Sequence, residues 1–274
     1  MWPAGWRPRS AEAVLPQLEL FGRTFSPYAL SGLVGFLAAL FFAYRAAKKQ
    51  GLDEIRLLYA ALFSALGALV GAHLLYALID LPLLWETIAG LGSVSSVFDL
   101  LGRLGRVFGG GVFYGGLIGG ALVGWLYLRR TEKDPLPYAD LGAVAVPLFH
   151  CFGRVGCFLA GCCYGVEWAP GIVFHHSLIE QANGVPRFPV QLCEAALNLG
   201  LFFLLWALWR RRRLPGKLGA LYLVIYPFYR FFLEFLRGDS YRGLLWGLST
   251  SQWISLVLFI FGCFLLLKRK KAEP

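Results

Sequence analysis

Apolar residues recur along the chain in long runs, separated by short polar links. A bilayer core about 30 Å thick requires about 20 apolar residues per helix. The pattern therefore predicts an all-α integral membrane protein with about seven transmembrane helices. The expected spans cover residues 27–45, 57–79, 108–128, 139–160, 190–209, 218–236 and 252–267.

Two segments depart from this pattern. Residues 81–107 mix apolar and charged positions, which predicts an amphipathic stretch lying along the membrane interface. Residues 164–188 form a polar loop. Because no other link is long, we expect one membrane domain over residues 1–274. The N-terminal residues lack the apolar core of a signal peptide, so the first span is expected to direct insertion.

Composition and charge placement fit the same picture. Hydrophobic residues make up 58% of the chain and charged residues 15%, whereas soluble domains carry about 25% charged residues. The net charge of +10 lies in clusters after the first, third, fifth and seventh spans, which predicts cytoplasmic ends there and an outward N-terminus. This placement argues against nucleic-acid binding. The clusters are Arg45, Lys48 and Lys49; Arg129, Arg130 and Lys133; Arg210 to Arg213; and Lys268 to Lys271.

Charged residues inside the spans are the strongest functional signal, because burying a charge in a membrane is costly. Arg154 lies in the fourth span, and Arg230 and Glu234 share a face of the sixth. The latter two could be a structural ion pair, and Arg237 could extend to the headgroups. Two arginines with one nearby glutamate instead suggest an anionic ligand, and a phospholipid phosphate is the obvious candidate.

The stretch GGGVFYGGLIGG, from Gly109 to Gly120, opens the third span. Its glycines could pack helices closely. Alternatively, Gly115 and Gly116 could line a lipid headgroup site with Tyr114 projecting into it.

The stretch HCFGRVGCFLAGCCYG combines a histidine with four cysteines. His150 lies four residues before Arg154 and is either a base or a core histidine. The cysteines could bind a metal with His175 or His176, or exchange disulfides. Their spacing disfavours both, because a separation of five points Cys157 and Cys162 to different helix faces. We therefore expect buried cysteines that act as small hydrophobes, and neither metal nor cofactor.

Four motifs together, GGGVFYGGLIGG, GRVGCFLAGCCYG, RFPVQLCEAALN and YPFYRFFLEFLRGD, resemble the prolipoprotein diacylglyceryl transferases in order and spacing from Tyr28 to the last span. The resemblance implies a multi-pass enzyme of the bacterial cytoplasmic (inner) membrane with an outward active site. Such an enzyme moves the diacylglyceryl group of phosphatidylglycerol to the cysteine thiol of a lipoprotein precursor. Its partners would be phosphatidylglycerol, the precursor peptide and the bilayer.

The resemblance also implies site roles for the residues that match the family's motifs. Arg154 and Arg230 would hold the phosphate, and Glu234 would orient Arg230. The residues expected to bind substrate are Tyr28, Gly115, Gly116, Cys157, Gln191, Tyr226 and Arg237, and Glu194 belongs to the same motif as Gln191.

Three positions depart from the family's pattern. Tyr114 replaces a histidine, Cys157 an asparagine and Cys162 a glutamate, which resembles a cysteine-containing branch. A phenol with a pKa of about 10 is a poor base at neutral pH, so His150 is the candidate base. Because a fold does not fix a substrate, other functions stay open. These are a related transferase with another acceptor, a lipid or anion transporter or binding protein, and a redox or metal protein.

Overall fold

The computed structural model describes residues 9–10, 18–20, 23–79, 81–110, 112–177, 179–239 and 244–268, which are mostly helical. The helices are α1 (Pro27–Gln50), α2 (Glu54–Ile79), α3 (Leu81–Ala89), η1 (Gly90–Ser93), α4 (Val97–Phe108), α5 (Phe113–Thr131), α6 (Leu136–Leu159), η2 (Glu180–Ala182), α7 (Val190–Arg210), α8 (Leu218–Leu233), η3 (Glu234–Leu236) and α9 (Thr250–Leu267). The strands are β1 (Arg9–Ser10), β2 (Leu18–Leu20), β3 (Arg23–Phe25), β4 (Glu167–Val173), β5 (Pro186–Arg187), β6 (Leu244–Leu245) and β7 (Leu248–Ser249).

Within the described residues, six helices are long and apolar enough to cross a membrane. They are α1, α2, α6, α7, α8 continued by η3, and α9. This confirms the prediction of an all-α multi-pass membrane protein. The expected third span is present as the 19-residue helix α5, but its glycines and the terminal Arg129 and Arg130 dilute its apolar character. A count of seven spans and the direction of insertion stay predictions.

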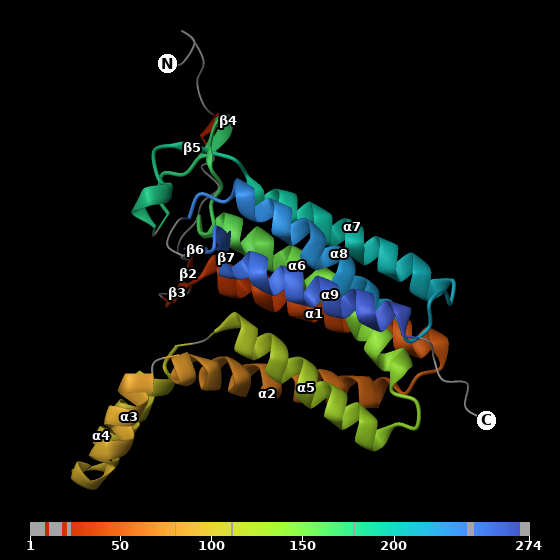
Figure 1. Cartoon of the computed structure of the whole chain (residues 1–274), viewed down its shortest axis with the longest axis horizontal. Helices are drawn as coiled ribbons and strands as arrows, with labels where there is room; N and C mark the ends of the chain where they lie inside the picture. Colours follow the sequence, from red (N-terminus) through yellow and green to blue (C-terminus); the bar gives the residue numbers. More distant parts are fainter. Residues whose placement is uncertain are drawn as a thin grey trace. The chain divides into compact units, whose positions relative to one another are not determined.

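The chain divides into two compact units. The first comprises Met1–Ala46 and Ala139–Pro274, and the second comprises Ala47–Tyr138. In the first unit, α1, α6, α7, α8 and α9 run alongside one another (Figure 1). The expectation of one membrane domain over the whole chain stays a prediction.

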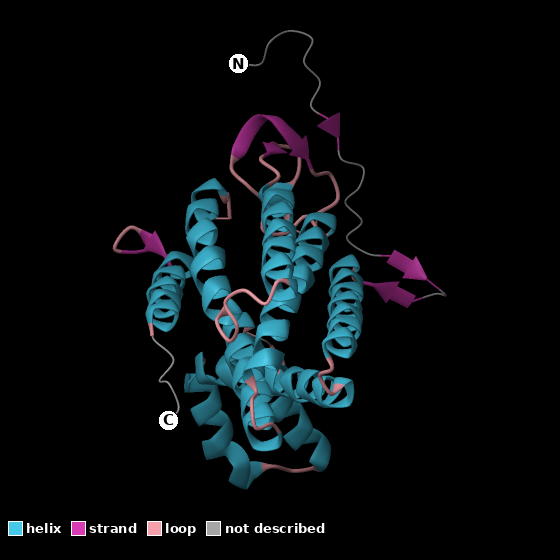
Figure 2. Cartoon of the chain, turned by 90° about the vertical axis from the view of Figure 1, so that its right-hand side faces the viewer, coloured by secondary structure: helices cyan, strands magenta, loops and turns pink. Residues whose placement is uncertain are grey.

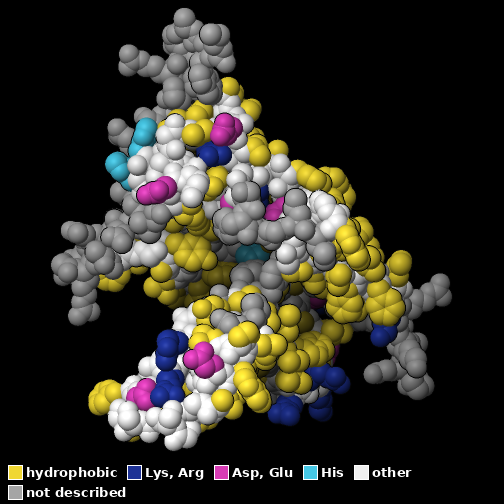
Figure 3. Space-filling view, turned by 60° about the vertical axis from the view of Figure 1, so that its left-hand side comes forward, with side chains coloured by type: hydrophobic (Ala, Val, Ile, Leu, Met, Phe, Trp, Pro, Cys, Tyr) yellow, Lys and Arg dark blue, Asp and Glu magenta, His cyan; other side chains and the backbone are white. Residues whose placement is uncertain are grey.

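The first unit is held together by an apolar core between α6, α7 and α8. Val144 of α6 packs with Leu205 of α7 and Leu218 of α8, and all three are almost fully buried. The outward faces of the helices are also apolar, with leucine, isoleucine and phenylalanine side chains exposed along them (Figure 3). Exposed apolar flanks of this extent are typical of helices surrounded by lipid.

An acidic residue at the start of α6 fixes the beginning of α8. The carboxylate of Asp140 accepts hydrogen bonds from the backbone N–H groups of Gly216 and Leu218. The first N–H groups of a helix have no partner within the helix, so this carboxylate satisfies donors that burial would otherwise leave unpaired.

The segment expected as a polar loop contributes two strands, β4 and β5, to a small sheet at one end of the helices (Figure 2). Its strand order is β1-β4-β5, with β1 parallel to β4 and β4 antiparallel to β5. Beneath it, Phe158 at the end of α6 packs with Tyr164, Phe174 and Ala182. The sequence pattern missed these strands because β1 and β5 have only two residues each and β4 contains a proline and a glycine.

In the second unit, α2 and α5 approach closely through glycines. A Cβ atom at Gly71 would lie 2.3 Å from the carbonyl oxygen of Gly115, and one at Gly115 would lie 2.2 Å from that of Gly71. Gly116 also faces α2, where a Cβ atom would lie 3.3 Å from the carbonyl oxygen of Ala68. The two candidate glycines thus serve helix packing, and their role in substrate binding stays a prediction.

The amphipathic stretch expected around residues 81–107 forms α3, η1 and α4. The side chain of Ser96 accepts a hydrogen bond from the N–H of Asp99 and so caps α4. Arg103 Nε lies 3.0 Å from Asp99 Oδ1, and this hydrogen bond lowers the pKa of Asp99 from its ordinary value. Phe98 and Leu101 are exposed on the same helix, which fits the predicted interfacial character.

Gly71→Ala should destabilise the protein by about 1–3 kcal/mol, because the added methyl group collides with the backbone of α5. The matched control is Gly102→Ala in α4, where a Cβ atom meets nothing within 4 Å. That change should stabilise by about 0.5–1 kcal/mol through helix propensity. Thermal unfolding in detergent measures both, and equal midpoints would contradict close α2–α5 packing.

Asp140→Ala should lower the free energy of unfolding by about 1–3 kcal/mol, because it leaves the buried N–H of Leu218 without an acceptor. Asp140→Asn retains one oxygen acceptor and should lose less. The order of the two midpoints in thermal unfolding checks this. A smaller loss for alanine than for asparagine would show that the carboxylate does not stabilise α8.

Candidate functional site

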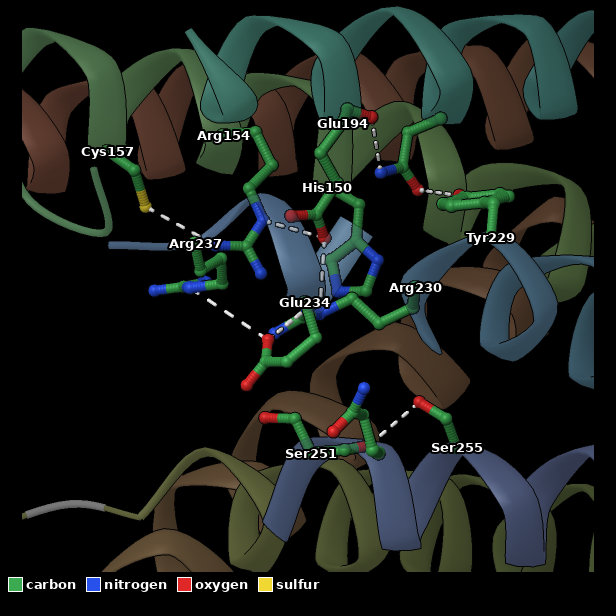
Figure 4. A network of polar contacts seen from close by, with 12 residues as sticks. His150, Arg154, Cys157, Glu194, Tyr229, Arg230, Glu234, Arg237, Ser251 and Ser255 are labelled. Atoms are coloured by element: carbon green, nitrogen blue, oxygen red, sulfur yellow. Dashed lines mark hydrogen bonds and ion pairs between the residues drawn. The ribbon is translucent and has the colours of Figure 1, made fainter. Parts of the chain in front are cut away.

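Polar side chains from three helices of the first unit meet inside the apolar bundle (Figure 4). Arg154 comes from α6, Glu194 from α7 and Arg230 from α8. Glu194 Oε1 lies 3.0 Å from Arg154 Nε and 3.8 Å from Arg230 Nε. One carboxylate is therefore shared by two arginines from different helices.

The network continues into the turn that follows α8. Arg230 Nη1 lies 2.7 Å from Glu234 Oε2, and Ser249 Oγ donates a hydrogen bond of 2.7 Å to Glu234 Oε1. Ser249 also caps α9, since its side chain accepts from the N–H of Gln252. Glu234 therefore joins the end of α8 to the beginning of α9.

Arg237 forms the outer part of the network. Its Nη2 lies 2.6 Å from Asp239 Oδ2 and its Nε lies 3.9 Å from Glu234 Oε2. Burial disfavours its charged form, but hydrogen bonds to Asp239 and Cys163 outweigh burial, so the pKa of Arg237 is raised. Arg237 thus remains charged at every physiological pH.

The arrangement corrects the expected charge balance. Three arginines face three carboxylates, Glu194, Glu234 and Asp239, rather than two arginines facing a single glutamate. The carboxylates are almost completely buried, whereas the side chain of Arg154 is 21% exposed. Arg154 is therefore the most exposed of the three arginines in this network.

A second set of polar groups lies deeper along α7 and α8. Asn198 Nδ2 donates to the backbone oxygen of Glu194, and Tyr229 Oη donates to Asn198 Oδ1 at 3.0 Å. His150 Nδ1 lies 3.3 Å from Tyr222 Oη, and the rings of His150 and Tyr226 are 5.1 Å apart. His150 and Tyr226 are thus brought beside the network, and their chemical roles stay predictions.

The prediction that Cys157 and Cys162 point to different helix faces is wrong. Helix α6 ends at Leu159, and two residues later Gly161 adopts a left-handed φ of 70°. The N–H of Cys162 then bonds to the oxygen of Cys157, and that of Gly161 to the oxygen of Phe158. This is the Schellman ending of a helix. It returns Cys162 toward Cys157, so the two thiols do not point to different helix faces.

Three thiols gather at this turn. The Sγ atoms of Cys157, Cys162 and Cys163 lie within 4.8 Å of one another. Arg154 Nη1 is 3.8 Å from Cys157 Sγ, so the thiols border the arginine network. Within the described residues, His175 and His176 do not join this group.

Two further candidates lie around the thiols. Gln191 is buried and donates from Nε2 to the backbone oxygen of Cys162 at 2.8 Å. Tyr28 lies in the first turn of α1 and packs against Gly156, where a Cβ atom would be 3.3 Å from the Cα of Tyr28. Tyr114 lies in α5 of the other unit, and its side chain is outside the described residues.

Comparison with known proteins identifies the family. A sequence model of the family described as prolipoprotein diacylglyceryl transferase matches residues 17–268. The chain belongs to this family.

Relatives within the prolipoprotein diacylglyceryl transferase family cover nearly the whole chain. A protein of Clostridium tetani named phosphatidylglycerol–prolipoprotein diacylglyceryl transferase is 36% identical over 90% of this chain and 94% of its own length. A Clostridium perfringens protein with the same name, numbered 2, is 35% identical over 90% of this chain and 92% of its own length. A Geobacter sulfurreducens protein named phosphatidylglycerol–prolipoprotein diacylglyceryl transferase is 35% identical over 91% of this chain and 94% of its own length.

Several members of the network were not identified from the sequence. Glu194 was noted only as part of a family motif and Asp239 only by its place at the end of the sixth span, and Asn198 and Ser249 were not considered. A signal was present for two of them, because Glu194 and Asn198 are four residues apart in an otherwise apolar helix. Polar residues that share one face of a membrane helix usually face the protein interior.

Glu194→Gln should destabilise the protein by about 3–5 kcal/mol, because two buried arginines lose their common counter-charge. The matched control is Glu167→Gln, whose side chain is 72% exposed and lies 3.9 Å from Arg187. That change should cost about 0–1 kcal/mol. Thermal unfolding in detergent compares them, and an equal effect would show that Glu194 does not carry the network.

Proposed function

We propose that this protein transfers the diacylglyceryl group of phosphatidylglycerol to the cysteine thiol of a lipoprotein precursor. The sulfur attacks a glyceryl carbon, the carbon–oxygen bond breaks, and glycerol phosphate leaves with the bonding electrons. A thioether is the product. The proposal includes an active site at the outer face of the bacterial inner membrane. It is supported by the names of the relatives, which state these substrates for those proteins.

The observation that carries the proposal is a partly exposed arginine held in place by a buried carboxylate. Arg154 uses Nε in its pair with Glu194. Its two terminal nitrogens form the fork that matches phosphate oxygens, and one of them, Nη1, also lies 3.8 Å from Cys157 Sγ. A lipid phosphate would therefore meet a guanidinium whose orientation is already fixed by Glu194.

The other two arginines of the network would position Arg154 and stabilise the leaving phosphate. Arg230 and Arg237 are each less than 10% exposed and are paired with carboxylates, so they position the site and supply a positive field. As the carbon–oxygen bond breaks, negative charge grows on the phosphate. Fixed positive groups in a water-poor site stabilise such charge without reorganisation.

The nucleophile would require little activation. A free thiol has a pKa of about 8.5, so a small fraction is thiolate at neutral pH. Holding two membrane-bound substrates together removes much of the entropic barrier. His150 is the candidate base, and it contacts Tyr222 and Tyr226 beside the arginine network.

Arg154→Lys should reduce the rate of transfer by about 10²–10³-fold, because lysine cannot bond to two phosphate oxygens at once. Removing one donor that stabilises developing negative charge typically lowers a rate by about this factor. The assay mixes purified protein, phosphatidylglycerol and a lipobox peptide with one cysteine, and measures the peptide's mass. Arg103→Lys in α4, outside this network, is the control and should retain activity.

Two outcomes would count against the proposal. Full activity of Arg154→Lys would remove the phosphate-gripping role. No diacylglyceryl-sized mass gain in folded wild-type protein, with an active relative assayed alongside, would remove the transfer itself. Replacing phosphatidylglycerol by phosphatidylethanolamine in the same assay tests the choice of donor.

A further inference from the structure

The thiols of Cys157, Cys162 and Cys163 are not used by the transfer as described above. In the described part of the chain, their sulfur atoms form a group that no fourth histidine, cysteine or carboxylate joins. All three cysteines are free of disulfides. Cys157 is buried, and the other two are partly exposed. Three converging thiols with one open side are the kind of arrangement that binds a soft cation.

The backbone is shaped to bring these thiols together. The Schellman turn at Gly161 places Cys162 beside Cys157, and a Cβ atom at Gly161 would lie 2.6 Å from the side chain of Ser177. Cys163 itself adopts a left-handed φ of 56°. A non-glycine residue in this region is uncommon and carries strain, and such strain often marks a functional site.

The distances suit a tetrahedral zinc-like ion. Zinc–sulfur bonds of about 2.3 Å place bound sulfurs about 3.8 Å apart. The three Sγ atoms already lie within 4.8 Å of one another, so small side-chain rotations would complete the contacts. Zinc sites with four protein ligands are usually structural, whereas catalytic sites hold three and leave one position open.

The surroundings suit the charge of such a centre. Three thiolates and one divalent cation carry a net charge of −1. Arg154 Nη1 lies 3.8 Å from Cys157 Sγ, and Gln191 holds the backbone of Cys162. Arg237, at the outer part of the network, lies close enough to Cys163 to interact with it electrostatically. Nearby positive charges of this kind stabilise an anionic metal–thiolate centre.

We propose that Cys157, Cys162 and Cys163 bind a zinc-class divalent cation and that its fourth position takes the sulfur of the acceptor cysteine. This inference rests on the proposed transferase function. A coordinated thiol loses its proton, which passes to solvent water. The cation would thus provide an acceptor thiolate next to Arg154, which grips the phosphate.

The reaction then balances without an oxidant or reductant. An electron pair of the bound sulfur forms the carbon–sulfur bond, and the electrons of the broken carbon–oxygen bond leave on glycerol phosphate. The thioether product is uncharged and is a poorer ligand than a thiolate, so it departs. This role also accounts for the cysteines found where the family pattern has asparagine and glutamate.

The binding test titrates Co²⁺, a coloured substitute for Zn²⁺, into the reduced full-length protein in detergent. We expect thiolate-to-cobalt absorption that saturates at one ion per chain, and competition by Zn²⁺. Cys162→Ser and Cys163→Ser should each lose this absorption. The control variants Cys151→Ser and Cys193→Ser lie outside the group and should retain it. Absorption that is absent from wild type, or unchanged in Cys162→Ser, would overturn the proposal.

The acceptor test adds a lipobox peptide to the cobalt form. A peptide with one cysteine should shift the absorption toward that of four thiolates, and the same peptide with serine should not. Identical spectra would overturn the role of the fourth position. A mass two hydrogens below the reduced chain, retained in reductant, would identify a disulfide in place of the cation site and would likewise overturn the proposal.

The transfer assay separates this inference from the proposed function. Chelator-treated protein should lose most of its transfer activity and regain it with Zn²⁺. Equal transfer with and without Zn²⁺ would overturn the metal role and leave the transferase intact. A cobalt spectrum that responds to the cysteine peptide, with no transfer under any condition, would instead refute the transferase and leave the cation site standing.

Discussion

The shared carboxylate of Glu194 is the interaction on which the first unit depends. It is 3% exposed and lies between arginines from α6 and α8, inside helices whose other faces are apolar. Ionised groups are costly in such surroundings unless they are paired. The packing of α6, α7 and α8 satisfies this requirement by bringing Arg154 and Arg230 to the same carboxylate oxygen. Glu234 and Ser249 extend this constraint from α8 to α9.

The same constraint prepares the site for chemistry. A guanidinium that is already held by a buried carboxylate loses little conformational entropy when a phosphate binds. This pre-ordering would favour the reacting complex. Asn198 and Tyr229 hold α7 and α8 together one turn deeper. The thiols at the end of α6 adjoin Arg154. The residues proposed to bind the donor and those inferred to bind the acceptor are therefore joined through one side chain.

Much of this could be predicted without the structure. The six described spans lie where the apolar runs indicated, because hydropathy is a local property that any helix in lipid must satisfy. Arg154, Arg230 and Glu234 were identified because charges inside such runs are rare. The partners of these charges were harder to assign. A sequence shows that Glu194 lies in a helix, but not which neighbouring helix its face meets.

The sequence by itself determined the membrane class, the helix positions, the family resemblance and the arginines that define the site. Only the tertiary structure decided the full charge balance, the packing role of Gly115 and Gly116, and the grouping of the cysteines. The physical reason is the range of the interactions. Helix formation in lipid depends on neighbouring residues, whereas ion pairs between helices depend on packing. The reversal after α6 depends on a backbone turn at Gly161, which spacing along an ideal helix cannot represent.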